Sequence, residues 1–226
     1  MSAEPKRGVV IAIDGPAGAG KSTLARALAL ELGLPYVNTG LMYRSVAAGA
    51  LREGADPRDG AALADLARRL RFSIEEGSPP ALRIDRGPGG QELTGADVEG
   101  VVSAVARHPE VRSVLRAEQR RLGAAGSVME GRDIGTVVFP DADVKLFLRA
   151  EPEERAARRQ SERGSDDPLL ARALERRDAL DARTNPLVPS SDASVVDTTG
   201  LGPDQVLDEV LALVREITGG GQPGRG

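Results

Sequence analysis

Short apolar stretches alternate along the chain with amphipathic segments of helical period. The apolar stretches predict buried strands at residues 9–13, 35–38, 127–130, 144–148 and 194–196. The amphipathic segments predict helices at about residues 22–32, 41–52, 61–71, 100–107, 110–122, 152–163, 168–182 and 203–217. Because strands and helices take turns, we expect an α/β fold with a mostly parallel five-stranded sheet and helices on both faces.

The middle of the chain differs, because its β-like pieces are short and lie between Gly-Ser-Pro-Pro and Gly-Pro-Gly-Gly turns. We expect pieces at 72–74, 81–85 and 91–93 to make residues 72–100 a small β-rich insertion.

The remaining chain predicts a single domain, residues 1–226. Its core is expected at 9–71 and 101–217, and its tails at 1–8 and 218–226. A Gly-Ser-Asp-Asp break after the helix at 152–163 predicts a short lid over about 155–170.

The most specific motif is Gly-Pro-Ala-Gly-Ala-Gly-Lys-Ser between the first strand and the first helix, a full match to the phosphate-binding P-loop pattern. Its backbone N–H groups surround a phosphate at a helix N-terminus, where the helix dipole favours an anion. Lys21 is expected to reach the β- and γ-phosphates, and the Ser22 hydroxyl to bind Mg²⁺. We therefore expect a P-loop NTPase fold whose ATP-binding residues are Gly15, Pro16, Ala17, Gly18, Ala19, Gly20, Lys21, Ser22 and Thr23.

Composition narrows the function classes. The chain has 226 residues, enough for one α/β domain, and a formal net charge of −4, which gives no electrostatic footprint for nucleic acid. It has no cysteine and a single histidine, His108, so disulfides, thiolate metal sites and two-histidine zinc sites are excluded. The apolar run at 9–13 is too short for a signal peptide, and no stretch approaches the roughly 20 apolar residues of a membrane span. We expect a soluble, cytoplasmic protein with no membrane partner.

A P-loop alone does not say what is done with the nucleotide. A regulatory GTPase needs a guanine-reading N-K-x-D segment, which the chain lacks, and a mechanical ATPase usually has more mass and a strand ending in Asp-Glu. Arginines that could hold a second phosphate follow the loop instead, which favours a small kinase.

Three further segments resemble bacterial cytidylate kinases. They are Asn-Thr-Gly-Leu-Met-Tyr-Arg at 38–44, Glu-Gly-Arg-Asp-Ile-Gly-Thr-Val-Val-Phe-Pro at 130–140, and Arg-Asp-Ala-Leu-Asp-Ala-Arg at 177–183. The resemblance extends from about residue 9 to 217. It implies transfer of the γ-phosphoryl group of ATP, with Mg²⁺, to CMP and dCMP. Two alternatives remain open: a related P-loop kinase for UMP, AMP or shikimate, and a non-enzymatic ATP-binding switch. We lean towards a monomer.

The resemblance also implies the acceptor site. Arg44 and Arg132 would grip the acceptor phosphate, with Thr39 and Tyr43 beside them. The base would lie against Ser103, Arg112 and Asp133. A carboxylate can accept from the cytosine amino group, whereas uracil presents a carbonyl oxygen there.

The same resemblance places Arg177 and Asp181, one helical turn apart, on the ribose, although a surface salt bridge is the competing interpretation. Arg183 would contact phosphate, but it stands two positions from Asp181 where the family usually has three. Arg158 and Arg159 would act from the lid.

Two positions depart from the family. Glu130 stands where the family usually has Asp, and we expect it to hold the Mg²⁺ hydration shell. Asn38 likewise replaces a commoner Asp.

Overall fold

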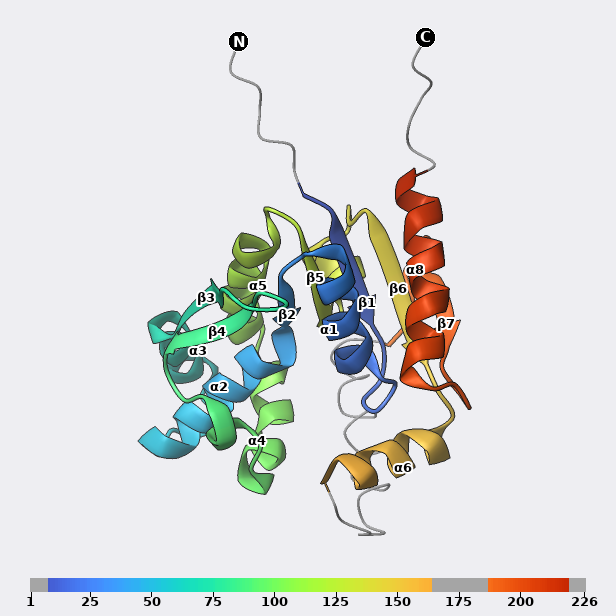
Figure 1. Ribbon diagram of the computed structural model, residues 1–226. Helices are drawn as coiled ribbons and strands as arrows, with labels where there is room; N and C mark the ends of the chain where they lie inside the picture. The colour runs from blue at the N-terminus through green and yellow to red at the C-terminus, as the bar shows by residue number, and fades with distance from the viewer. Residues whose placement is uncertain (1–7, 164–186, 220–226) are drawn as a thin grey trace, which may run out of the picture.

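The structure is a computed structural model that describes residues 8–163 and 187–219. Within these residues, one sheet of seven strands runs in the order β3-β4-β2-β5-β1-β6-β7 (Figure 1). The strands are β1 (Val10–Asp14), β2 (Tyr36–Asn38), β3 (Arg71–Glu75), β4 (Ala81–Arg86), β5 (Ser127–Gly131), β6 (Val144–Arg149) and β7 (Ser194–Asp197). All neighbours pair in parallel except β3 and β4.

The mostly parallel sheet is confirmed, and the five predicted strands form the consecutive block β2-β5-β1-β6-β7, but the described residues form seven strands and not five. The backbone N–H of Tyr36 donates to the carbonyl of Pro80 at 2.8 Å, and Tyr36 pairs with Ala81. The β3–β4 hairpin therefore extends the main sheet. Residues 91–93 are not a strand, because they lie in the short 3-10 helix η1 (Gly90–Leu93), where the Glu92 carboxylate accepts from the backbone N–H of Gly89.

Helices cover both faces of the sheet. They are α1 (Lys21–Leu32), α2 (Thr39–Glu53), α3 (Gly60–Arg69), α4 (Ala96–Arg107), α5 (Pro109–Gly123), α6 (Pro152–Arg163) and α8 (Pro203–Gly219). Helix α4 begins at Ala96 rather than near residue 100 as expected. The helix predicted at 168–182 lies outside the described residues. No helix in the described ranges is long and apolar enough to cross a membrane.

Strand β1 shows why both faces are covered. Val10 and Ala12 pack into the core formed with α2, α3, α4 and α5, whereas Ile11 and Ile13 pack into the core formed with α1 and α8. Successive strand side chains point to opposite faces, so a run of four apolar residues such as Val10–Ile13 must be buried on both.

The carboxyl ends of β1, β2 and β5 meet at one edge, because the three strands are adjacent and parallel. The loop after β1, the start of α2 and the segment after β5 all leave the sheet there, and α6 lies beyond this edge (Figure 1).

Candidate active site

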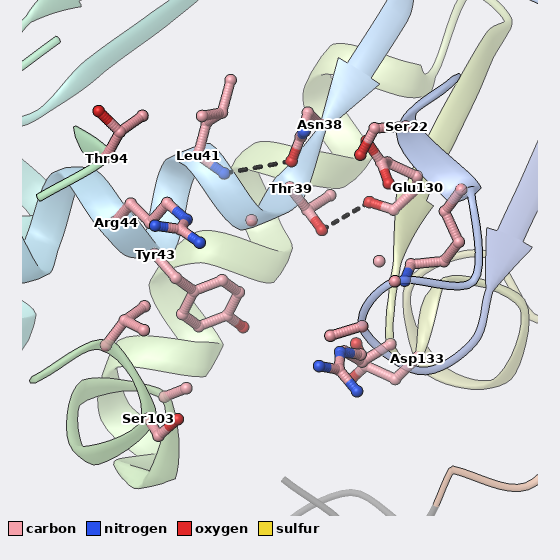
Figure 2. Close-up of a pocket in the computed structure, with 18 of the residues that line it drawn as sticks. Ser22, Asn38, Thr39, Leu41, Tyr43, Arg44, Thr94, Ser103, Glu130 and Asp133 are labelled. Atoms are coloured by element: carbon pink, nitrogen blue, oxygen red, sulfur yellow. Dashed lines mark hydrogen bonds between the residues drawn. The ribbon is translucent and has the colours of Figure 1, made fainter. Parts of the chain in front are cut away.

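A cavity of about 450 Å³ opens at the carboxyl edge of the sheet (Figure 2). It brings the P-loop together with most of the residues predicted for the acceptor. The predicted residues that line it are Ala17, Gly18, Gly20, Lys21, Ser22, Thr23, Thr39, Tyr43, Arg44, Ser103, Arg112, Glu130, Arg132 and Asp133. Asn38, Leu41, Thr94 and Val102 also line it and were not predicted as site residues.

The P-loop conformation depends on its glycines. Gly15 has φ 146°, and a Cβ there would lie 2.3 Å from the carbonyl oxygen of Leu148. Gly18 has φ 78°, and a Cβ there would lie 2.8 Å from the carbonyl oxygen of Arg155. Helix α1 then begins at Lys21 with no side-chain cap, which leaves its first turn suited to an anion. Gly15, Pro16 and Ala19 are not among the residues that line the cavity.

Asp14, at the end of β1, ties the P-loop strand to the segment after β5. Its two carboxylate oxygens accept from the backbone N–H groups of Ile134 and Gly135, each at 2.8 Å. Burial raises the pKa of Asp14 to about 6, against the opposing effect of these two hydrogen bonds. Ile134 and Gly135 directly follow Arg132 and Asp133, so this contact anchors the segment that carries both.

We expect Asp14 to make stability depend on pH. Its pKa in the folded protein, about 6, lies above the unfolded value, so the folded state binds more protons between about pH 4 and 6. Stability should therefore fall as pH rises through this window, by up to about 3 kcal/mol. Asp14→Asn should flatten this slope, as measured by urea denaturation at pH 4.5 and 6.5. An equal slope in both proteins would contradict the assignment.

Helix α2 presents the acceptor-phosphate candidates. The Asn38 side chain caps the helix by accepting from the backbone N–H of Leu41 at 3.3 Å. Arg44 follows in the second turn of α2 and lines the cavity; its guanidinium donates to the carbonyl of Leu93 at 3.0 Å and pairs with Glu99 at 3.0 Å. Arg132 lines the cavity from the end of β5. Two guanidinium groups therefore border the space that faces the P-loop.

The base candidates lie at the α4–α5 end of the cavity. Ser103 lines it from α4, and Arg112 from α5, where its guanidinium also donates to the carbonyls of Ala106 and Arg107. Asp133 is 8% exposed and lines the cavity from the segment after β5. Its Oδ2 accepts from Arg116 at 2.5 Å.

Sequence reasoning missed Arg116. A signal was present, because Arg112, Arg116 and Arg120 recur every four residues and so share one face of α5. Arg120 donates to the carbonyls of Val137 and Val138. Arg116 and Arg120 thus both bind the segment after β5 from the same helix. Arg116 binds the Asp133 carboxylate, whereas Arg120 binds backbone carbonyls.

Arg116→Met should lower the free energy of unfolding by about 1.5–3 kcal/mol, because it leaves the Asp133 carboxylate without its charged partner. The matched variant Arg120→Met should cost only about 1 kcal/mol, since its two acceptors are neutral backbone carbonyls and not a carboxylate. Chemical denaturation of the two variants measures the difference. Equal losses of unfolding free energy in the two variants would mean that the Arg116–Asp133 ion pair adds no more stability than a hydrogen bond to a carbonyl.

The lid candidates are placed only in part. Arg158, on α6, is not among the residues that line the cavity; its guanidinium pairs with Glu154 and donates to the Thr198 hydroxyl at 2.9 Å. A Cβ on Gly20 would lie 3.7 Å from Arg158 Nη1, so this guanidinium flanks the P-loop. The Arg159 side chain, Arg177, Asp181, Arg183 and positions 164–170 of the expected lid lie outside the described residues.

The chain is similar to known proteins over nearly its whole length. A family model described as Cytidylate kinase matches residues 11–216. The cytidylate kinase of Rhodococcus jostii (strain RHA1) is 45% identical over 226 aligned residues, which cover 95% of this chain and 98% of that protein. The cytidylate kinase of Shouchella clausii (strain KSM-K16) is 44% identical over 222 residues, which cover 93% of this chain and 97% of that protein.

Among solved structures, an uncharacterized protein from Eubacterium ventriosum ATCC 27560 matches with a TM-score of 0.50 and 14% identity, over 93% of this chain and 99% of that one. That likeness concerns the fold alone. The family model and the two relatives span nearly the whole chain, from the P-loop to the last helix, and so the chain belongs to the cytidylate kinase family.

Proposed function

We propose that the protein transfers the γ-phosphoryl group of ATP to CMP, and also to dCMP, giving ADP and CDP or dCDP. The observation that carries this proposal is the shared cavity, which is lined by the P-loop together with Arg44, Arg132, Asp133 and Ser103. A donor phosphate at the loop and an acceptor phosphate at the arginines would meet within one enclosed space. Family membership supports the same reaction.

The reaction needs little covalent help from the protein. The acceptor phosphate is already mostly dianionic near neutral pH, with a second pKa of about 6, so no general base is required. Catalysis then depends on alignment of the two phosphates and on cationic groups that balance the charge of the transition state. Lys21, Arg44, Arg112 and Arg132 are the cationic side chains among the residues that line this cavity.

The base end suits cytosine. A carboxylate such as Asp133 accepts hydrogen bonds, and Arg116 already donates one to its Oδ2. It would accept from the amino group of cytosine, while Arg112 would donate to the ring acceptors. Uracil would present its carbonyl oxygen to the same carboxylate. The site therefore favours CMP over UMP.

The residues at the loop also fit Mg²⁺. The Ser22 hydroxyl and the Glu130 carboxylate line the cavity beside the loop, and both are the hard oxygen ligands that Mg²⁺ prefers. In the described residues no cluster of three or more acidic, histidine or cysteine side chains could hold a metal alone. That fits an ion carried largely by nucleotide phosphates and water, with Ser22 as a ligand and Glu130 acting through water; when bound, it neutralises phosphate charge.

The ribose contacts and one phosphate contact are assigned to residues outside the described ranges. We assign the ribose to Arg177 and Asp181 and a phosphate contact to Arg183, on the sequence resemblance alone. Arg158 and Arg159 are assigned to the lid, whose closure would exclude water from the transferring group. We also expect one domain that acts as a monomer in the cytoplasm.

A coupled ADP-release assay tests the proposal across CMP, dCMP, UMP, AMP, GMP and shikimate. We expect rapid release with CMP and dCMP, a much weaker response with UMP, and little with the others. A preference for AMP, UMP or shikimate would replace the assigned acceptor. ADP release that is slow and independent of every acceptor would support an ATP-binding switch instead.

A further inference from the structure

A buried tyrosine lies directly behind the metal side of the cavity. Tyr36, in β2, is 4% exposed and is not among the residues that line the cavity. Its hydroxyl donates to Glu130 Oε1 at 2.5 Å and accepts from Asn38 Nδ2 at 3.2 Å. The Ser22 hydroxyl is a further hydrogen-bond donor to the same phenol oxygen. One hydroxyl therefore joins the P-loop, the end of β5 and the start of α2.

The direction of these hydrogen bonds follows from the chemistry of the group. A phenol with its ordinary pKa of about 10 keeps its proton at neutral pH. A phenol has one proton to donate, and Glu130 takes it. Its oxygen lone pairs are then left for the protons of Asn38 and Ser22.

This arrangement orients both oxygen groups that the proposed function assigns to Mg²⁺. A serine hydroxyl binds a cation through its lone pairs, so its proton must point to another acceptor. The Tyr36 oxygen supplies that acceptor on the side away from the cavity. Glu130 Oε1 is bound to Tyr36, which sets the plane of the carboxylate and the position of Oε2. Figure 2 shows Ser22, Glu130 and Asn38 gathered at this end of the cavity, apart from Ser103.

We propose that Tyr36 is a positioning residue that holds the Ser22 hydroxyl and the Glu130 carboxylate ready for the nucleotide-bound divalent cation. This inference rests on the proposed use of a metal–ATP complex. Asn38 is part of the same device, because its amide donates to Tyr36 while its carbonyl oxygen caps α2. A carboxylate at position 38 could cap the helix but could not donate to the phenol.

The test is the affinity of the protein–ADP complex for Mn²⁺, measured by electron paramagnetic resonance in the absence of CMP. Tyr36→Phe removes only the hydroxyl and keeps the ring, including its contact with the Arg26 guanidinium 5.6 Å from the ring centroid. We expect Mn²⁺ affinity to fall about tenfold, the scale seen when an outer-shell partner is lost. ADP affinity without metal, measured by calorimetry, should stay within about twofold by the same reasoning, since the hydroxyl contacts no phosphate.

Two further variants keep the test decisive. Asn38→Ser retains a capping side chain but is too short to reach the phenol, so it should weaken Mn²⁺ binding in the same direction even if Tyr36→Phe folds poorly. Ser73→Ala is the control, because it deletes a hydroxyl that donates to Asp85 at 2.9 Å in the β3–β4 hairpin and does not line the cavity. It should leave Mn²⁺ affinity unchanged.

Wild-type Mn²⁺ affinity in both a folded Tyr36→Phe and a folded Asn38→Ser protein would overturn the inference. So would a loss in Tyr36→Phe that persists in full on a Glu130→Gln background, since the two groups should act as one unit. Failure of the proposed function is a separate result: the wild-type protein would then release no ADP in response to CMP, whatever its Mn²⁺ affinity.

Discussion

Lys21→Ala should lower kcat for CMP phosphorylation by at least about a hundredfold, the scale of one lost preorganised charge contact. Lys21 lines the cavity at the first residue of α1, and its ammonium donates to the carbonyl of Pro16 at 2.7 Å. The side chain is therefore held over the P-loop, where a β- or γ-phosphate would lie. The measurement is steady-state ADP release at saturating ATP and CMP.

Thermal unfolding supplies the control for this variant. Loss of one partly exposed hydrogen bond should cost only about 1 kcal/mol, so the fold should survive. Near-normal turnover by a folded Lys21→Ala protein would refute the kinase mechanism, because the loop would then hold no reacting phosphate.

Asp133→Asn should reduce the preference for CMP over UMP by about 1–3 kcal/mol, or roughly five- to 150-fold in the ratio of kcat/KM. An amide can donate to the uracil carbonyl oxygen, which the carboxylate cannot do. The comparison requires kcat/KM for both acceptors in both proteins, with KM for ATP as the internal reference.

The ion pair with Arg116 complicates this variant, because Asp133→Asn also leaves a half-buried guanidinium without its partner. The double variant Arg116→Met/Asp133→Asn removes both charges and separates stability from specificity. If the double variant regains stability but keeps the reduced CMP preference, Asp133 reads the base. An unchanged CMP-to-UMP ratio in the single variant would remove Asp133 from the base site.

Local chemistry is what made the P-loop predictable. Its glycines supply the backbone conformations, and the apolar strand before it and the helix after it are adjacent in the sequence. The five parallel strands were predictable for a related reason, since alternation of strand and helix restricts the possible connections. The residues that family motifs identified mostly line one cavity, although the structure does not itself test what they bind.

The hairpin shows where sequence reasoning stopped. Residues 72–86 contain correct strand and turn signals, but nothing local says that β4 will pair with β2. Periodicity identifies a strand and not its neighbour, so a small separate insertion was as consistent with the pattern as a seven-stranded sheet.

Tertiary structure alone decided how the cavity is braced. Asp14 binds Ile134 and Gly135, which lie 120 and 121 positions later in the sequence. Tyr36 binds Glu130, which lies 94 positions later. In the sequence, Asp14 only ends an apolar strand and Tyr36 only begins a short one, with no motif to mark a partner for either. The sequence by itself determined which residues are candidates for phosphate chemistry, because that depends on residue type and local backbone. Only folding decided which buried groups orient them, because that depends on parallel strands from distant segments ending at the same edge of the sheet.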